Sequence, residues 1–291
     1  MRNAVRALQA SIAVGAALIL VAPSAQADIG SAIVVAHRAG ATSSLGEGTK
    51  EAYEDSVAHG ADVLDGDIHW TKDSSDADTV GSILVIHDST LDRITDCTGK
   101  VSSRLWTYIR DNCETDAGGN KLIRLKTLIA YGDKVEKQVA IGLKNSTITN
   151  AQAKQLWNTI KYSDVQLEAP LSRLDALNKV KKLDAADPGH KIKYALVSSG
   201  SGGWGTGAKP NPSVATVKSV GNCSANSPCY FHAELSIPAS VMSTYKNADI
   251  EVFVFTGKTR SDYEKMVALD PYGVVVNDVN DFQEWRDENS P

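Results

Sequence analysis

Short apolar runs rich in β-branched residues recur along the chain, separated by segments in which apolar residues repeat every three to four positions. The short runs are typical of buried strands, and the longer repeat predicts amphipathic helices. Strands are expected at residues 32–37, 61–68, 138–144, 164–169, 193–199, 229–235, 251–257 and 273–278. Helices are expected between most of them, among others at residues 49–59, 151–163, 171–183, 238–246 and 261–269.

The number of strand-then-helix units favours one fold. Eight such units in about 260 residues match the count and size of the (β/α)₈ TIM barrel, an α/β fold. The alternative, a doubly wound parallel sheet, usually has about six strands, so eight units suit it less well. We therefore expect one TIM-barrel domain over residues 28–291.

One further apolar run, at residues 82–88, departs from this rhythm. The segment before it is rich in Asp, Ser and Gly and has no helical period, so it supplies no crossover helix to a parallel strand. The run is therefore expected to pair antiparallel with the second strand. The predicted fold is a TIM barrel with a β-hairpin inserted after strand 2.

The first 27 residues have a composition of their own. Arg2 and Arg6 precede an apolar run, and the Ala-Gln-Ala at 25–27 matches the small-residue pattern of a signal-peptidase site. A membrane anchor is the alternative, but a spanning helix needs roughly 20 apolar residues, more than this run contains. We expect residues 1–27 to be a secretory signal peptide and the mature protein to be secreted, with no transmembrane segment after cleavage.

The net charge bears on which partners the protein can bind, and the cysteines bear on whether it contains disulfides. The formal net charge is −5, and no block of Lys or Arg interrupts the chain, so nucleic acid is not an expected partner. Export permits disulfides. Four cysteines allow three connectivities, of which the local one, Cys97 with Cys113 and Cys223 with Cys229, is favoured. A metal site is the alternative reading, but neither pair has Cys-x-x-Cys spacing.

Side chains suited to acid–base chemistry lie at the ends of the predicted strands, where a TIM barrel carries its active site. They are His37 and Arg38 at the end of the first strand, Asp65 and Asp67 in the second, His87 from the hairpin and Lys144 at the end of the third strand. Two imidazoles can remove and donate protons, and Arg and Lys can neutralise phosphate oxygens. The set is suited to phosphodiester cleavage.

The two aspartates raise a separate question. Because successive side chains of a strand point to opposite faces, Asp65 and Asp67 share one face. Two carboxylates so close repel each other unless a positive charge lies between them. A Ca²⁺ or Mg²⁺ ion with oxygen ligands would meet this need and would polarise a phosphoryl group.

These motifs, in this order, resemble those of the glycerophosphodiester phosphodiesterase family. The chain reads HRAG, EGT, GADVLDGDI, TKD, VIHD followed by STLDRITDCTGKV, IGLK, VFVFTGK and YGVVVND. The family has His-Arg-Gly, Glu-Asn-Thr, Gly-Ala-Asp-x-x-Glu-x-Asp-Val, Thr-Lys-Asp, His-Asp, Ile-Glu-Ile-Lys, Trp-Thr-Val-Asn and Gly-Ile-Ile-Thr-Asp. The resemblance runs over residues 32–282, nearly the whole predicted mature chain.

The resemblance implies metal-dependent hydrolysis of glycerophosphodiesters to glycerol 3-phosphate and an alcohol. It also implies a role for each matching residue. His37 and His87 would be the acid–base pair. Arg38 and Lys144 would bind the substrate phosphate. Asp65 and Asp67 would be metal ligands, and Glu47 would support the site from the first loop.

The chain departs from the family pattern at several positions. Asp65 replaces a metal-ligand Glu, and Gly142 stands where the family has its third metal carboxylate. Glu168 and Glu234, near later strand ends, are candidates to replace the lost ligand, or water fills its place. Gly48 replaces the Asn of the Glu-Asn-Thr motif, and Phe255 replaces the C-terminal Trp.

Three alternative functions follow from these departures and from the fold. A phospholipase D-like lipase on a similar barrel would cleave intact phospholipid and would need an apolar patch at the barrel mouth. A non-catalytic relic would bind phosphate or a lipid head group, with Gly142 marking the lost metal ligand. A paired-carboxylate glycosidase is also conceivable on this fold, but it leaves the two motif histidines unexplained.

Overall fold

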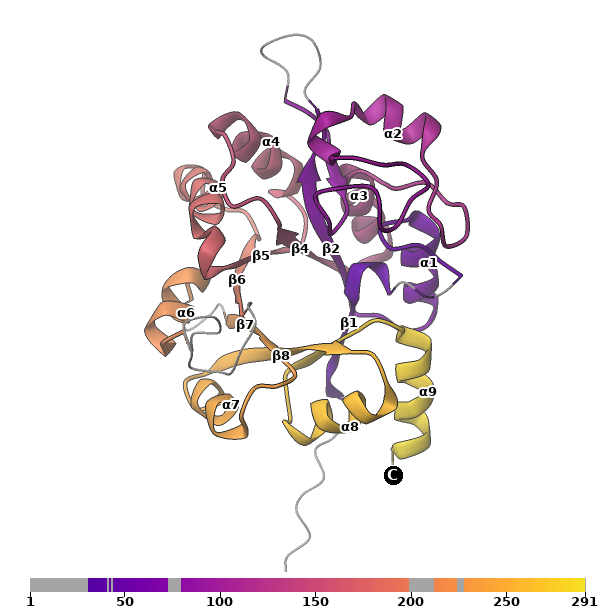
Figure 1. The fold of residues 1–291 in the computed structure, drawn as a ribbon. Coiled ribbons are helices and arrows are strands. Elements are labelled where there is room, and N and C mark those ends of the chain that lie inside the picture. Colours follow the sequence, from indigo (N-terminus) through magenta and orange to yellow (C-terminus); the bar gives the residue numbers. More distant parts are fainter. Residues whose placement is uncertain are drawn as a thin grey trace, which may run out of the picture.

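Eight parallel strands close into a barrel in the computed structural model, which describes residues 31–40, 42, 44–72, 80–198, 212–223 and 228–290. β1 pairs with both β2 and β9, which closes the ring (Figure 1). The predicted TIM barrel is therefore confirmed, whereas the predicted signal peptide, residues 1–27, lies outside the described residues. The barrel strands are β1 (Ile33–Ala36), β2 (Val63–Trp70), β4 (Gln138–Leu143), β5 (Val165–Pro170), β6 (Lys193–Val197), β7 (Cys229–Glu234), β8 (Ile250–Gly257) and β9 (Gly273–Val276).

Helices surround the strands (Figure 1). In α4, Thr149 and Gln152 form a capping box, and one face buries Leu156 and Ile160 against the barrel. Within the described residues, no helix combines the length and apolar character needed to cross a membrane. The helices are α1 (Lys50–Ala58), α2 (Trp106–Asn112), α3 (Leu125–Val135), α4 (Asn150–Ile160), α5 (Leu174–Ala186), α6 (Val214–Gly221), α7 (Ala239–Lys246), α8 (Arg260–Ala268) and α9 (Val279–Asn289), with 3₁₀ turns η2 (His37–Ala39), η3 (Val101–Ser103) and η4 (Leu171–Arg173).

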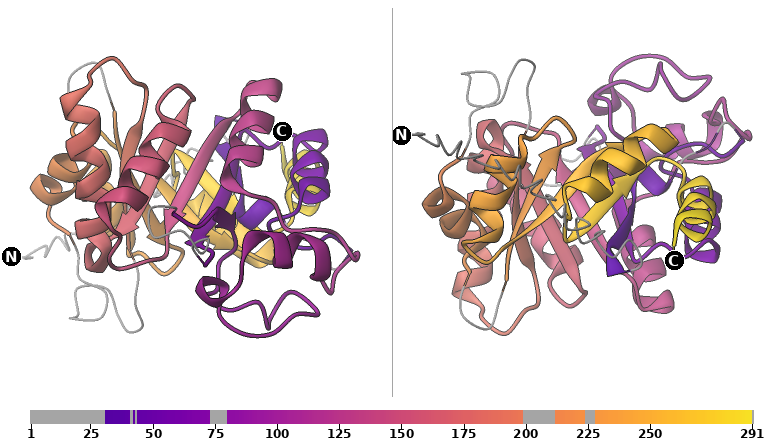
Figure 2. Two further views of the ribbon diagram at one scale, coloured as in Figure 1. Left: turned by 90° about the horizontal axis from the view of Figure 1, so that it is seen from above. Right: turned by 90° about the horizontal axis from the view of Figure 1, so that it is seen from below.

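The inserted hairpin is confirmed. β3 (Ile83–Val85) runs antiparallel to the end of β2, with His69 opposite Leu84. Residues 86–124, which we call the insertion, follow β3 and project from one end of the barrel (Figure 2). A small separate core that includes Leu91, Ile109 and Leu122 gives the insertion its own support.

Both predicted disulfides are present. Cys97 bonds Cys113 within the insertion, with their Cα atoms 5.4 Å apart. Cys223 bonds Cys229 between α6 and β7, with a Cα separation of 5.3 Å. The local connectivity is therefore confirmed. The Cys97–Cys113 bond joins two positions within the insertion and does not connect the insertion to the barrel strands.

The interior of the barrel is layered. A lower layer is apolar and is formed by Val35, Val63, Ala140, Ala195, Tyr230, Phe253 and Val275. Because every second residue of a strand faces inward, the next inward positions toward the C-terminal ends form an upper layer. Those positions include Asp65, Glu168 and His232, all buried. The fold thus places polar side chains above an apolar floor.

Candidate active site

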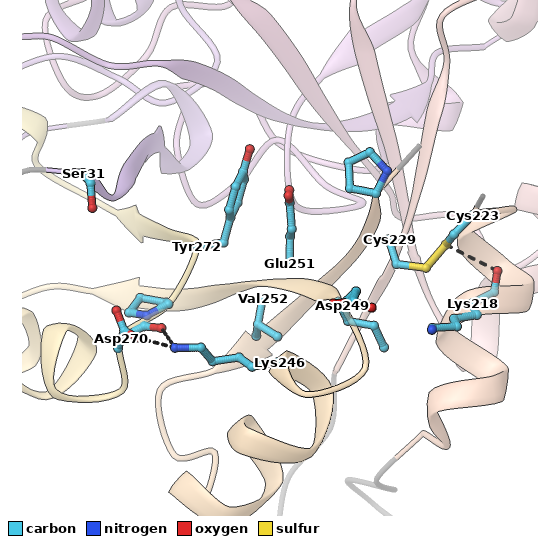
Figure 3. A pocket seen from close by; sticks show the side chains of 13 residues that line it. Ser31, Lys218, Cys223, Cys229, Lys246, Asp249, Glu251, Val252, Asp270 and Tyr272 are labelled. Carbon is cyan, nitrogen blue, oxygen red and sulfur yellow. Dashed lines mark hydrogen bonds and ion pairs between the residues drawn. A yellow bond between two sulfur atoms is a disulfide. The ribbon is translucent and has the colours of Figure 1, made fainter. Parts of the chain in front are cut away.

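Two cavities lie at opposite ends of the barrel. The larger, about 1010 Å³, is lined by residues that begin or precede strands, such as Cys229, Asp249 and Tyr272 (Figure 3). It contains none of the side chains predicted to act on a substrate. The smaller, about 440 Å³, is at the C-terminal ends of the strands and is lined by His37, Arg38, Glu47, Asp65, Asp67, His87 and Lys144. The structure therefore brings all seven predicted functional side chains to one cavity.

His37 follows β1 directly and is held by the opposite end of the chain. Its Nδ1 lies 2.7 Å from Oδ1 of Asn277, which follows β9. An amide oxygen accepts hydrogen bonds, so the proton is assigned to Nδ1, and Nε2 keeps its lone pair. Burial, and then the charge of Arg38, lower the pKa of His37 to about 4. His37 is therefore neutral at pH 7.

Arg38 adopts a left-handed backbone conformation, with φ of 52°. Such values are uncommon for residues other than Gly. The conformation lets the Arg38 backbone N–H donate to Asp65 Oδ2 at 3.0 Å. It also brings the guanidinium within 3.5 Å of both Asp67 and Glu47. The strained turn after β1 thus serves to direct a cation toward the carboxylates.

Asp65 and Asp67 are both buried, with 8% and 7% of their surfaces exposed. Burial, together with the charge of Asp67, raises the pKa of Asp65 to about 7. Burial alone would raise the pKa of Asp67 as well, but the charges of Lys144, His87 and Arg38 hold it below its usual value. Lys144 Nζ lies 2.9 Å from Asp67 Oδ1. The side chains of Lys144 and Arg38 thus pair with Asp67, whereas Asp65 accepts a hydrogen bond from the Arg38 backbone N–H.

The position of the missing carboxylate lies beside these aspartates. Asp67, Gly142 and Glu168 are in register across β2, β4 and β5 and face the same cavity. A Cβ atom on Gly142 would lie 2.2 Å from Asp67 Oδ1. The Asp67 carboxylate therefore occupies the space that a side chain at position 142 would need.

Glu168 forms a buried polar group with two neighbours that face the same interior. Its Oε1 accepts a hydrogen bond from Gln166 Nε2 at 2.9 Å and lies 3.1 Å from His232 Nε2. Burial, and then the charge of Asp65, raise the pKa of Glu168 well above its usual value. Burial lowers the pKa of His232 to about 3. Both residues therefore favour their neutral forms.

His87 follows β3, and the insertion surrounds it with charged partners. Its Nδ1 lies 2.6 Å from Asp88 Oδ1, while the other Asp88 oxygen pairs with Arg93 Nε. The two terminal nitrogens of Arg93 donate to the two oxygens of Glu47 at 2.6 and 3.1 Å. Burial lowers the pKa of His87, although the charge of Asp67 opposes this effect. The proton on Nδ1 faces Asp88, which leaves Nε2 for the cavity.

Comparison with known families and structures identifies the chain's relatives. Residues 37–281 match the model of the glycerophosphoryl diester phosphodiesterase family. The chain belongs to this family. The sequence resemblance is therefore confirmed, as is the prediction, at the level of the family, of a phosphodiesterase enzyme.

The individual proteins that resemble this chain share limited sequence identity with it. The uncharacterized protein YqiK of Bacillus subtilis is 31% identical over 121 residues, and the match covers 40% of this chain and 46% of the relative. A glycerophosphodiester phosphodiesterase of Agrobacterium tumefaciens is 18% identical, with a TM-score of 0.63 over 87% of this chain and 99% of that one. A phosphodiesterase of Oleispira antarctica, solved with the product sn-glycerol-3-phosphate, is 16% identical, with a TM-score of 0.68 over 87% and 96% of the two chains.

The family resemblance implies a divalent cation, which needs oxygen donors in the cavity. Among the residues that the structure describes, no three His, Cys, Asp or Glu side chains converge to hold a metal ion. Asp65 and Asp67 offer two buried carboxylates, and burial together with the charge of Asp67 raises the pKa of Asp65. Mg²⁺ is commonly held by one or two carboxylates, waters and substrate phosphate. The two aspartates fit a cation bound in that way.

Sequence reasoning missed several residues of the cavity. It assigned no role to Asn277, Asp88, Arg93 or His232, although all except Asp88 line the cavity and Asp88 contacts His87. Asn277 and His232 could have been found from the same rule as His37, because each lies at the C-terminal end of a barrel strand. Arg93 had no such signal, since it lies inside the insertion.

Proposed function

We propose that the protein hydrolyses glycerophosphodiesters to glycerol 3-phosphate and an alcohol. The observation that carries this proposal is the convergence of two histidines, each held at Nδ1, with Arg38 and Lys144 in a cavity of about 440 Å³. Two imidazoles with their Nε2 atoms available are suited to general base and general acid catalysis. Family membership supports the same substrate class.

The different partners of the two histidines suggest their roles. His37 is neutral and bonded to an amide, so it acts as the base and removes a proton from the nucleophile. His87 is bonded to the Asp88 carboxylate, which favours the protonated imidazole and opposes the lowering of the His87 pKa by burial, so His87 is the residue that donates a proton to the leaving alcohol oxygen. The nucleophile oxygen bonds to phosphorus as the ester P–O bond to the alcohol breaks. A water nucleophile gives the monoester directly, whereas a neighbouring hydroxyl gives a cyclic phosphate first.

Charge stabilisation is assigned to the remaining residues. Arg38 and Lys144 bind the phosphate oxygens, where negative charge grows in the transition state. Asp65 and Asp67 would hold a Ca²⁺ or Mg²⁺ ion, which supplies a further positive charge at the phosphoryl group when it is bound. Glu47 contacts both Arg38 and Arg93 and supports the first loop.

The test is release of glycerol 3-phosphate from glycerophosphocholine by the purified mature protein. It is run with added Ca²⁺ or Mg²⁺, with chelator, and with His37→Ala as control. We expect turnover that falls in chelator and that drops by about 10²–10⁴ in His37→Ala, the usual contribution of a general base. Turnover that survives chelation would contradict the cation requirement but not the reaction.

A second set of substrates separates the alternatives. The same protein is given intact phosphatidylcholine or sphingomyelin in vesicles. Cleavage of the lipid alone would replace the proposal with a phospholipase D-like lipase. No cleavage of either class by protein with a native far-ultraviolet spectrum would favour the non-catalytic relic, and binding of glycerol 3-phosphate measured by calorimetry would then support that reading.

We also infer that the protein acts outside the cell. Its first 27 residues carry the signal-peptide pattern, and two disulfides are compatible with an oxidising compartment. N-terminal sequencing of protein collected from the culture medium tests this inference. A mature chain that begins at Asp28 is the expected result.

A further inference from the structure

Arg93 lines the cavity and binds carboxylates from two separate segments with short contacts. Its Nε donates to Asp88, next to His87, and its terminal nitrogens form a fork on Glu47 at 2.6 and 3.1 Å. Glu47 is nearly buried, with 9% of its surface exposed. A bidentate Arg–carboxylate pair fixes geometry more strictly than a single contact does. Arg93 thus connects the insertion to the first loop of the barrel.

The contacts distinguish Arg93 from the cation assigned to phosphate. Arg38 approaches Glu47 and Asp67 no closer than 3.5 Å, so its guanidinium retains hydrogen-bonding capacity. Arg93 already directs both terminal nitrogens and Nε at carboxylate oxygens. Because Arg93 satisfies Glu47, it also leaves Arg38 less strongly paired. Arg93 is therefore arranged to hold other residues rather than to bind substrate.

The residue that Arg93 holds most directly is the partner of His87. Asp88 accepts the His87 Nδ1–H with one oxygen and contacts Arg93 with the other. The Asp88 side chain is 28% exposed, so without Arg93 it would be free to turn into water. His69 Nε2 also lies 3.1 Å from the His87 carbonyl and fixes the backbone there. The imidazole orientation thus depends on an aspartate that Arg93 anchors.

We propose that Arg93 is a positioning residue, which holds Asp88 so that the His87 imidazole keeps Nδ1 protonated and presents Nε2 to the leaving-group oxygen. This inference rests on the proposed function and deepens it. Its consequence is a dependence on the leaving group. An alkoxide needs a proton from His87 to depart, whereas 4-nitrophenolate departs without one.

The experiment compares Arg93→Gln with the wild type on two diesters of glycerol 3-phosphate. One is glycerophosphocholine, and the other is the 4-nitrophenyl ester. We expect kcat on glycerophosphocholine to fall about 10–100-fold, the usual loss when a residue that orients a functional group is removed. On the 4-nitrophenyl ester we expect a change below about threefold, because proton donation contributes little there. Asp88→Asn should show the same split.

Arg110→Gln is the matched control. Arg110 belongs to the same insertion and forms an exposed pair with Asp111 at 2.6 Å, without lining the cavity. It should leave both substrates unaffected. Equal losses on both esters in Arg93→Gln would show that Arg93 binds phosphate or only stabilises the fold, and no loss on either would show that it has no role. Both results overturn the proposal.

A second measurement does not depend on turnover. The hydrogen-bonded Nδ1 proton of His87 should give a downfield ¹H resonance, identified by its loss in His87→Ala. We expect this resonance to be lost or shifted in Arg93→Gln and retained in Arg110→Gln. An unchanged resonance in Arg93→Gln refutes the positioning role. Absent turnover of both esters by the wild type, with the expected resonances, would instead refute the proposed function alone.

Discussion

At the scale of single residues, two histidines that line the same cavity differ through the groups they contact. His37 is bonded to the Asn277 amide, and His87 is bonded to the Asp88 carboxylate. A neutral partner adds little stabilisation to a buried imidazolium, whereas a carboxylate adds more. The local contacts therefore support the assignment of His37 as base and His87 as acid.

The low pKa of His37 predicts how folding stability responds to acid. The folded protein binds a proton at His37 only near pH 4, whereas the unfolded chain binds one near pH 6.5. The unfolded state therefore holds more protons between these values, and the free energy of unfolding falls as the pH falls through this window. The loss due to His37 is about 3 kcal/mol over the whole window.

Urea unfolding at pH 7, 5.5 and 4.5 measures this effect, with His37→Gln as the comparison. His232, whose pKa burial also lowers, destabilises the protein in the same direction, but it is present in both proteins. The difference in slope between wild type and variant thus isolates His37. Parallel curves would contradict the low pKa.

At the scale of elements, the register of three strands sets the arrangement of the carboxylates. Asp67 on β2 is level with Gly142 on β4, which is level with Glu168 on β5. Because Gly142 has no side chain, Asp67 extends over it and meets Lys144 at 2.9 Å. The glycine that removes one carboxylate therefore also permits the contact between Asp67 and Lys144.

This packing predicts a loss of activity in Gly142→Ala. The added Cβ would lie 2.2 Å from Asp67 Oδ1, so the carboxylate must move away from Lys144. We expect kcat/KM on glycerophosphocholine to fall at least about 10-fold and the free energy of unfolding to fall by about 1–3 kcal/mol. Steady-state kinetics and urea unfolding measure the two quantities.

A double-mutant cycle with Lys144→Met tests the cause. If Gly142→Ala acts by separating Asp67 from Lys144, the losses in the double variant should be smaller than the sum of the single losses. Simple additivity would mean that the alanine acts through another contact. A gain of activity in Gly142→Ala would show that the observed position of Asp67 is not the active one.

At the scale of the whole molecule, closure of the barrel joins the two ends of the chain. β1 pairs with β9, and this pairing brings Asn277 within 2.7 Å of His37, 240 positions away in sequence. The base therefore depends on a partner from the last strand. Any loss of closure between these strands would also release His37.

Asn277→Asp tests this dependence. A carboxylate in place of the amide would stabilise the His37 imidazolium and raise its pKa, so the base would be protonated at higher pH. We expect the acidic limb of the kcat/KM profile to move up by about 1–2 pH units. Asn277→Ala, which adds no charge, should lower kcat without such a move. An unmoved limb in Asn277→Asp would contradict the assignment of His37 as the base.

Much of the architecture could be predicted because it depends on local patterns. Each of the eight runs expected to be a barrel strand became one, since such runs favour buried parallel strands. Four helices had no range named from the sequence, namely α2, α3, α6 and α9. α9 shows why: it buries Val279, Phe282 and Trp285, but its remaining residues are polar, so its apolar stripe is narrow.

The sequence by itself predicted the barrel, the hairpin and six of the side chains that meet at the cavity, because strand periodicity and strand ends are properties of contiguous residues. Glu47 came from the family motifs, and the disulfide pairs came from the short spacing of the cysteines. The tertiary structure alone decided which partners hold these side chains. The fork of Arg93 on Glu47 spans 46 positions, and the contact of His37 with Asn277 spans 240. Such contacts depend on barrel closure and on strand register, which no local pattern specifies.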